Sequence, residues 1–273
     1  MTLIPMTALP MNNRIIISLL AVLCCLPAMA GGKYKTDKDI SYKEGISRCK
    51  LDVSYVRNAK DRPVIVWFHG GGLTEGSKHT PEALLKEDYV VVAAGYRLYP
   101  ETQVADIIDD AAAAVAWVVK NISRYGGSPS KIYLAGHSAG GYLVAMLGLD
   151  KHYLAKYGAD ADSMAAIVPY SGQMITHFTE RAARGIPATR PVIDELSPLY
   201  HIRPDAPPFL VVTGGRETEL YRRYEENAYF VEMMKLVGHK NMVFCEEEGF
   251  THGGMAAPAH LLLMKYIKER NEN

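Results

Sequence analysis

The stretch from Lys131 to Leu147, KIYLAGHSAGGYLVAML, decides the fold class of this chain. Its start, Lys131–Leu134, predicts a strand, and its end, Tyr142–Leu147, predicts a helix. Between them stands G-x-S-x-G, where a sharp strand-to-helix turn would hold Ser138 in a strained conformation with its hydroxyl above the sheet. Glycines suit both flanking places because a side chain there would collide with the neighbouring strand or helix. We therefore interpret Ser138 as a nucleophile rather than an ordinary loop serine.

The first 30 residues have the pattern of a secretory signal peptide. Arg14 is their only charged residue, an apolar run follows over Ile15–Leu26, and Ala28-Met29-Ala30 provides a small-x-small cleavage site. The run is shorter than the roughly 20 residues of a membrane span, so we expect cleavage rather than a stable membrane anchor. The prediction is an exported protein, periplasmic or extracellular, with one catalytic domain over residues 31–273.

Charge and cysteine content exclude several classes of function. The chain has 30 basic and 30 acidic residues without a basic cluster, so we expect no nucleic-acid partner. Cys49 and Cys245 are the two cysteines outside the signal peptide, and they belong to strands expected near opposite edges of the sheet, so we predict that they are unpaired. The histidines and cysteines lack zinc-like spacing, and no metal site is predicted.

Apolar segments of strand length alternate with helical patterns along the chain, which predicts an α/β fold with a mostly parallel sheet. Residues 171–206 contain four prolines and weak periodicity, and we interpret them as a lid-like excursion above the sheet. Strands are predicted at 49–56, 63–68, 89–94, 132–135, 165–170, 209–213 and 242–245, and helices at 104–122, 142–147, 220–236 and 260–270.

A serine nucleophile needs a base to take its proton and an acid to orient that base. His252 lies in a glycine-rich loop just after the last predicted strand, at the edge where such sheets place ligands. Glu217 follows the penultimate strand in Thr213–Glu217 and is the predicted acid, although Glu219 and Glu225 lie close to it.

A glycine run supplies the third element of the predicted site. His69-Gly70-Gly71-Gly72 follows the 63–68 strand directly, and consecutive glycines let backbone N–H groups turn toward a bound oxyanion. We predict that the N–H groups of Gly71, Gly72 and Ala139 form this oxyanion hole.

Four motifs in order resemble those of α/β-hydrolase esterases, above all hormone-sensitive-lipase-like carboxylesterases and short bacterial feruloyl or acetyl esterases. They are HGGG at 69–72, YRLYPE at 96–101, GHSAGG at 136–141 and GFTHG at 249–253. The resemblance implies an eight-stranded sheet flanked by helices and a Ser138, His252 and acid triad that needs no cofactor. Two features depart from the family pattern. The acid motif is G-x-x-E rather than G-x-x-D, and too little chain precedes the 63–68 strand for an N-terminal cap.

The expected activity is hydrolysis of a small-acyl or carbohydrate-linked ester by a monomer or dimer. His69, Tyr170 and Gln173 are candidate substrate contacts because of their positions beside the predicted site. An amidase, arylformamidase or exopeptidase with the same triad remains open. So does a catalytically inactive binding domain.

Overall fold

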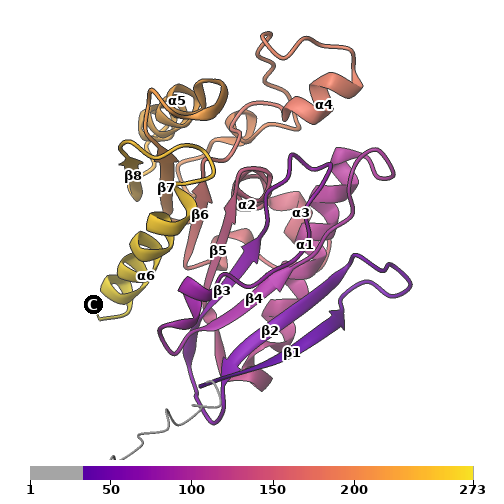
Figure 1. Cartoon of the computed structure of the whole chain (residues 1–273), viewed down its shortest axis with the longest axis vertical. Coiled ribbons are helices and arrows are strands. Elements are labelled where there is room, and N and C mark those ends of the chain that lie inside the picture. The colour runs from indigo at the N-terminus through magenta and orange to yellow at the C-terminus, as the bar shows by residue number, and fades with distance from the viewer. Residues whose placement is uncertain (1–32, 273) are drawn as a thin grey trace, which may run out of the picture. The chain divides into compact units, whose positions relative to one another are not determined.

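The central sheet has eight strands in the order β1-β2-β4-β3-β5-β6-β7-β8 (Figure 1). This computed structural model describes residues 33–272, and the predicted signal peptide lies outside them. The strands are β1 (Tyr34–Ser41), β2 (Lys50–Val56), β3 (Arg62–Phe68), β4 (Val90–Ala94), β5 (Gly127–His137), β6 (Ala166–Tyr170), β7 (Phe209–Gly214) and β8 (Met242–Glu247). The strand β2 runs antiparallel to both β1 and β4, whereas the pairs from β4 to β8 are parallel. The predicted eight-stranded, mostly parallel sheet is confirmed.

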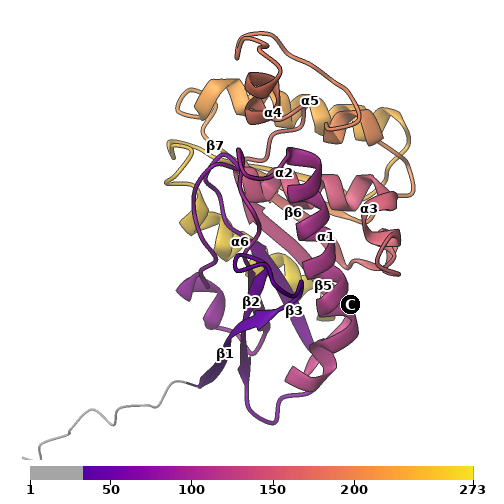
Figure 2. The same cartoon turned by 90° about the vertical axis from the view of Figure 1, so that its right-hand side faces the viewer.

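Helices cover both faces of the sheet. They are α1 (Val104–Asn121), α2 (Ala139–Leu149), α3 (Lys151–Ala155), α4 (Phe178–Ala183), α5 (Arg223–Leu236) and α6 (Ala256–Glu272), and the short 3-10 segments are η1 (Glu82–Leu85), η2 (Ile122–Tyr125), η3 (Ala161–Ser163), η4 (Pro198–His201) and η5 (Leu220–Arg222). Both α4 and α5 lie at the end of the molecule toward which the central parallel strands run (Figure 1 and Figure 2).

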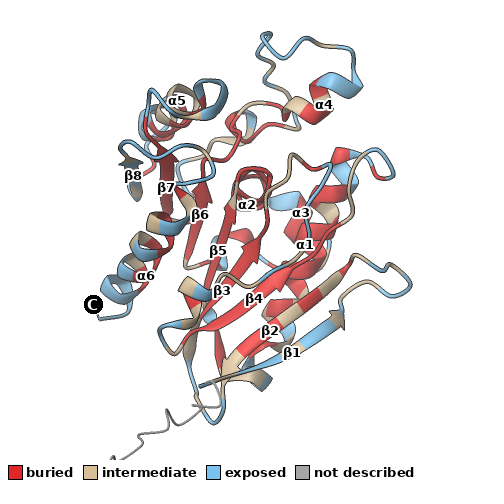
Figure 3. Cartoon of the chain, viewed as in Figure 1, coloured by how far each residue is buried: buried red, intermediate tan, exposed pale blue. Residues whose placement is uncertain are grey.

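Side chains of the central strands alternate between two buried layers. In β3, Val64, Val66 and Phe68 belong to the core beneath α1 and α2. Ile65 and Trp67 belong to the core beneath η1 and α6. A strand buried on both faces has a continuous apolar sequence, which is why Pro63–Phe68 is predicted correctly. Strands β4 and β6 are buried along their whole length, and β3 is buried from Val64 to Phe68 (Figure 3).

The edge strand β1 is not among the strands predicted from the sequence, the first of which begins at residue 49. Most of its side chains are exposed and the others are only partly buried, so the strand carries no apolar signal. It is held instead by its antiparallel pairing with β2, from Tyr34 opposite Val56 to Ser41 opposite Lys50.

One smaller expectation concerns the cysteines. Cys49 precedes β2 and Cys245 lies in edge strand β8, and both are free, as predicted. In the loop after β4, Arg97 binds the buried Asp110 of α1 with two hydrogen bonds of 2.7 and 2.8 Å, which anchors this loop. Within residues 33–272, no helix has the length and apolarity needed to cross a membrane.

Candidate active site

Ser138 occupies a one-residue turn between β5 and α2. Its φ of 55° and ψ of −112° lie outside the regions favoured by residues with side chains. Two glycines make the turn possible. A Cβ on Gly136 would lie 2.5 Å from the Gly140 carbonyl, and a Cβ on Gly140 would lie 2.1 Å from the Phe68 oxygen. The predicted strain at this serine, and the steric reason for its glycines, are confirmed.

Backbone hydrogen bonds fix this turn at the carboxyl edge of the sheet. The Ser138 N–H donates to the Tyr170 oxygen at 2.8 Å, and the Tyr142 N–H donates to the Ser138 oxygen at 3.0 Å. The Ala139 N–H, in the first turn of α2, donates to no group within residues 33–272. It is therefore free for an oxyanion, which the positive end of the helix dipole also favours.

The glycine loop after β3 lies against the nucleophile. A Cβ on Gly70 would lie 3.2 Å from the His137 oxygen and 3.4 Å from the Ser138 Cβ, so the loop is in direct contact with the serine turn. Gly71 has a φ of 112° and Gly72 a φ of 61°. Their carbonyls face the protein, because the Gly71 oxygen accepts from the Glu75 N–H at 2.9 Å and the Gly72 oxygen accepts from the Thr179 hydroxyl. The N–H groups of both glycines donate to no described residue, as an oxyanion hole requires.

His69, a candidate substrate contact, belongs to the support of this loop instead. Its ring is buried and stacks on Tyr96, with ring centroids 4.3 Å apart. Nδ1 lies 2.6 Å from the Gly70 oxygen, and the Tyr96 hydroxyl donates to the His69 oxygen at 2.7 Å. The substrate-binding prediction for His69 is therefore wrong, because packing and hydrogen bonds engage its ring beneath the glycines.

His252 lies in the loop after β8, and its Nδ1 is 2.7 Å from Oε1 of Glu219. The predicted acid Glu217 is exposed, whereas the Glu219 side chain is fully buried. The prediction of Glu217 as the partner of His252 is wrong. The N–H groups of Thr218 and Glu219 both donate to the Gly215 oxygen at 2.9 Å, and this tight turn leaves Glu217 outside and brings Glu219 back toward the sheet.

The Glu219 carboxylate accepts hydrogen bonds from several sides. Besides His252, the Ser171 hydroxyl donates to Oε2 at 2.6 Å, and the N–H groups of Gly214 and Leu220 donate at 2.9 and 2.7 Å. Burial alone would raise the pKa of this group, but these hydrogen bonds outweigh burial and lower the pKa of Glu219 to about 2. The group is therefore a carboxylate at ordinary pH and can stabilise a protonated imidazole.

Ser171 is a site residue that the sequence prediction missed. It directly follows β6, is completely buried and has a φ of 47°. Its N–H donates to the Val212 oxygen at 2.7 Å, and its hydroxyl lies 3.2 Å from the His252 Nδ1. Ser171 thus bridges the carboxylate and the base. The only signal in the sequence is a small polar residue at the carboxyl end of a strand.

The first turn of α5 supports this network from behind. Arg223 is only 1 % exposed, and its Nη1 donates to the Ser171 oxygen at 2.6 Å. Asn227 donates to the Gly172 oxygen at 2.9 Å, and Glu226 accepts from the Ile175 N–H at 3.1 Å. Buried polar groups that are paired in this way rigidify their surroundings, so the start of the 171–206 segment is held firmly against α5.

His137 connects the serine turn to the base. Its Nε2 lies 2.7 Å from the His252 oxygen, and the two imidazole rings are 4.7 Å apart between centroids. Burial, with a smaller effect of the neighbouring His252, lowers the pKa of His137 to about 4, so the neutral ring donates Nε2–H to that carbonyl. Ser138 Oγ makes no hydrogen bond to the His252 ring among the residues described. Such bonds often tighten only in the complex with substrate.

The two other candidate substrate contacts are buried. Tyr170 is completely buried, and its hydroxyl donates to the Ala259 oxygen of α6 at 3.1 Å. Its substrate-binding prediction is wrong, because β6 turns the ring toward the opposite layer. Gln173 is 4 % exposed, and its Oε1 accepts from the Phe178 N–H at 2.9 Å, so it fixes the start of α4 instead.

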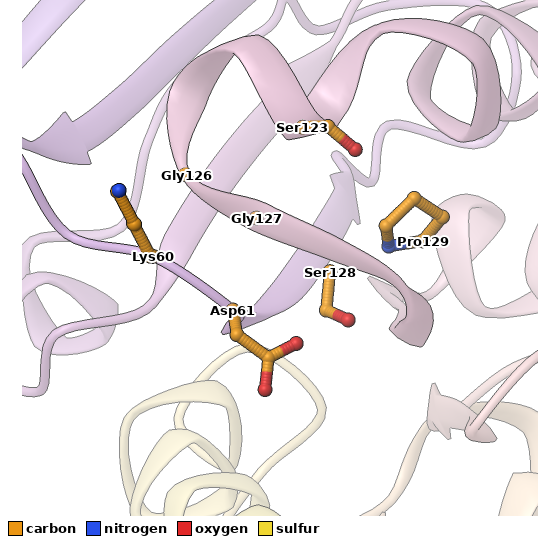
Figure 4. Close-up of a pocket in the computed structure, with 7 residues that line it drawn as sticks. All are labelled: Lys60, Asp61, Ser123, Gly126, Gly127, Ser128 and Pro129. Carbon is orange, nitrogen blue, oxygen red and sulfur yellow. The ribbon is translucent and has the colours of Figure 1, made fainter.

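Two hollows lie at the other end of the sheet. Figure 4 shows one of about 330 Å³ between Lys60-Asp61 and Ser123–Pro129. Its neighbour is lined by Asp61, Arg62 and residues near the end of α6. Both lie where β3 and β5 begin, whereas Ser138 follows the end of β5, so neither belongs to this site. Among residues 33–272, no cluster of three or more His, Cys, Asp or Glu is arranged to hold a metal.

The fold and the strained serine turn define an α/β-hydrolase with its nucleophile elbow after the fifth strand. Residues 51–221 match the BD-FAE family, and the chain belongs to that family.

Individual relatives agree with this assignment. The chain is 30 % identical to esterase LipC of Mycobacterium tuberculosis over 217 residues, 71 % of this chain and 53 % of LipC. It is also 30 % identical to the probable carboxylic ester hydrolase LipM of the same organism over 259 residues, 83 % of this chain and 59 % of LipM. The chain therefore spans just over half the length of these relatives.

Solved structures share the fold. Thermogutta terrifontis esterase 2, in a form phosphoramylated by tabun, superposes with a TM-score of 0.68 at 25 % identity. The match covers 87 % of this chain and 94 % of the esterase chain. A truncated carbohydrate esterase from gut microbiota superposes with a TM-score of 0.74, covering 89 % of this chain and 99 % of its own. Its identity is 18 %, so that likeness concerns the fold alone.

Proposed function

We propose that this chain is a serine carboxylic-ester hydrolase that forms an acyl-enzyme on Ser138. The observation that carries the proposal is the convergence of three groups at one edge of the sheet. They are a serine in the elbow conformation, free N–H groups beside it and a histidine 2.7 Å from a buried carboxylate. Together these are the nucleophile, oxyanion hole and oriented base that acyl transfer requires.

In the proposed reaction, Ser138 Oγ attacks the ester carbonyl carbon while Nε2 of His252 takes the hydroxyl proton. The carbonyl oxygen becomes an oxyanion and receives hydrogen bonds from the N–H groups of Gly71, Gly72 and Ala139. Collapse of this intermediate breaks the bond to the alcohol oxygen, and His252 returns the proton to that oxygen. Water then attacks the acyl carbon and gives one proton to His252. The bond from this carbon to Ser138 Oγ breaks, His252 returns the proton to Oγ, and the carboxylic acid leaves.

Glu219 keeps the base in place throughout these steps. Because its carboxylate is charged and faces Nδ1, it fixes the imidazole tautomer with Nε2 directed to the reaction and stabilises the imidazolium. Ser171 and Arg223 hold the carboxylate and the chain beside it, and they have no covalent part in the reaction.

A small acyl group, or an ester on a carbohydrate, is the proposed substrate class. The names of LipC and LipM support ester hydrolysis, and the neighbour from gut microbiota with the same fold is a carbohydrate esterase. Export is proposed from the signal-peptide pattern of residues 1–30.

The test is hydrolysis of p-nitrophenyl acetate and butyrate by residues 31–273, beside the Ser138→Ala variant. Turnover that disappears in this variant is the expected result. A matched acetyl anilide distinguishes an esterase from an amidase. Faster cleavage of the anilide than of the ester would show that the activity is that of an amidase. Absence of turnover of both substrates by the parent protein would contradict the proposal.

A further inference from the structure

One edge of the sheet is left open at β8. This strand is last in the sheet order and pairs only with β7 (Figure 1). The Phe209 N–H donates to the Asn241 oxygen at 2.9 Å, and Phe209 lies opposite Met242. Successive residues of a strand direct their backbone groups to opposite sides, so Asn241 and every second residue after it face β7. Met242, Phe244 and Glu246 therefore turn their N–H and C=O groups outward.

These outward backbone groups have no partner within residues 33–272. No hydrogen bond from a loop or a side chain of the described chain reaches them. A row of unpaired N–H and C=O groups can pair with a strand of another chain. Nothing in β8 opposes this, because the strand contains no proline, its register with β7 has no bulge, and Val243 is 41 % exposed.

The opposite edge of the sheet, β1, is protected against such pairing. Its register with β2 shifts at a bulge between Asp37 and Ile40, and Lys35, Lys38 and Asp39 are exposed on it. Bulges and charged side chains are the usual means by which an edge strand avoids pairing with another chain. The two edges differ in this respect, and only β8 is suited to receive a further strand.

Two unpaired charges of opposite sign flank β8. Lys240 precedes the strand and Glu248 follows it, both are exposed, and neither forms an ion pair with a described residue. Their midpoint in the sequence is Phe244, which is also the middle one of the three outward residues. The strand is therefore complementary to itself. When a second copy runs antiparallel about Phe244, each lysine stands opposite the glutamate of the other copy.

We propose that a second copy of this chain pairs with β8 about a two-fold axis at Phe244, so that the two sheets become one. Opposite charges that face each other across strands stabilise a pair, and like charges destabilise it. A centre at Glu246 would place this carboxylate against its own copy, whereas the centre at Phe244 brings no two carboxylates together. The hydrogen-bonded pairs are Met242 with Glu246 of the second copy, Phe244 with Phe244, and Glu246 with Met242.

The pairing continues both layers of side chains. Phe244 packs against Tyr224 of α5, with ring centroids 5.5 Å apart, and meets Phe244 of the second copy on this face. On the other face Cys245 belongs to the layer beneath α6, and the exposed Val243 stands opposite Cys245 of the second copy. Because the two β8 strands run in opposite directions, the two Ser138 sites lie at opposite ends of the joined sheet. The pairing therefore goes beyond the proposed esterase function and does not depend on it.

Charge exchange tests the register, with the dissociation constant of the dimer measured by light scattering over a dilution series. Lys240→Glu and Glu248→Lys each place like charges opposite one another at two symmetric contacts, and each should raise the dissociation constant about tenfold. The double variant exchanges the two charges and should restore the parent value. Lys38→Glu is the matched control, because Lys38 is an exposed lysine on the other edge strand, and it should change nothing.

A disulfide tests the contact itself. Residues that face each other between the hydrogen-bonded pairs have Cα atoms about 4.5 Å apart, a separation that a disulfide can bridge. Oxidised Val243→Cys should therefore form a covalent dimer through Cys245 of the second copy on a non-reducing gel. The same change combined with Cys245→Ser should form none.

Three results would overturn the proposal. One is a parent protein that is monomeric throughout the dilution series. Another is a dimer whose dissociation constant does not respond to the single charge changes or is not restored in the double variant. The third is a dimer that oxidised Val243→Cys does not cross-link. None of these measurements uses the esterase reaction, so failure of the proposed function would leave their outcome unchanged.

Discussion

Replacing Glu219 by glutamine removes one charge from the site and preserves the shape of the side chain. The carboxylate oxygen is 2.7 Å from His252 Nδ1. With an effective dielectric constant of about 20, unit charges at that separation attract by at most about 6 kcal/mol. This attraction acts on the imidazolium that forms as the serine is deprotonated. Its loss corresponds to a fall in kcat of roughly 10⁴-fold, the size seen when a triad carboxylate is changed to an amide.

The assay is kcat for p-nitrophenyl acetate at pH 8 for Glu219→Gln and for Glu217→Gln as the matched control. Because Glu217 is exposed and Glu219 is buried, the control should retain at least half of the parent activity. Thermal unfolding of both variants separates loss of fold from loss of catalysis. A large loss in Glu217→Gln together with a small one in Glu219→Gln would refute the reasoning and restore the acid expected from the sequence.

Three further predictions follow from contacts of the site. Ser171→Ala removes a 2.6 Å hydrogen bond to the buried carboxylate and should lower kcat for p-nitrophenyl acetate about tenfold; an unchanged kcat contradicts it. Gly140→Ala places a Cβ 2.1 Å from the Phe68 oxygen and should cost at least about 3 kcal/mol in urea unfolding, whereas Gly253→Ala, which meets nothing within 4 Å, should cost less than about 1 kcal/mol. Burial lowers the pKa of His137 to about 4 from an ordinary 6.5, so the folded state favours its neutral form. The contribution of His137 to the free energy of unfolding is therefore fully present above pH 6.5 and is lost as the pH falls toward 4. Urea midpoints that stay constant from about pH 7 to 4.5 would contradict this.

The serine turn could be predicted from the sequence because local sterics decide it. Gly136 and Gly140 are needed because a side chain at either position would collide with the element next to the turn. The order of strand, turn and helix in the sequence is enough to infer this requirement. The loop glycines at 70–72 follow the same logic, since they come directly after a buried strand. At these positions the prediction agrees with the structure because few other residue types fit there.

The acid could not be predicted with the same certainty. Glu217 and Glu219 both follow β7 in sequence, and only the Gly215 turn decides which one returns toward the sheet. The role of Ser171 depends on two segments that meet in space, the ends of β6 and β7. The sequence does not decide the orientation of Tyr170, because a residue at the end of a strand can face either layer, and its ring faces α6.

The central claim is that Ser138 is the nucleophile, and adduct mapping after reaction with paraoxon tests it most directly. Trypsin releases Ser138 in the peptide Ile132–Lys151, which contains no other serine, and Ser171 in the peptide Tyr157–Arg181. We expect one diethyl phosphate on Ser138 and none in Ser138→Ala. An adduct on Ser171, or labelling that persists in Ser138→Ala, would contradict it.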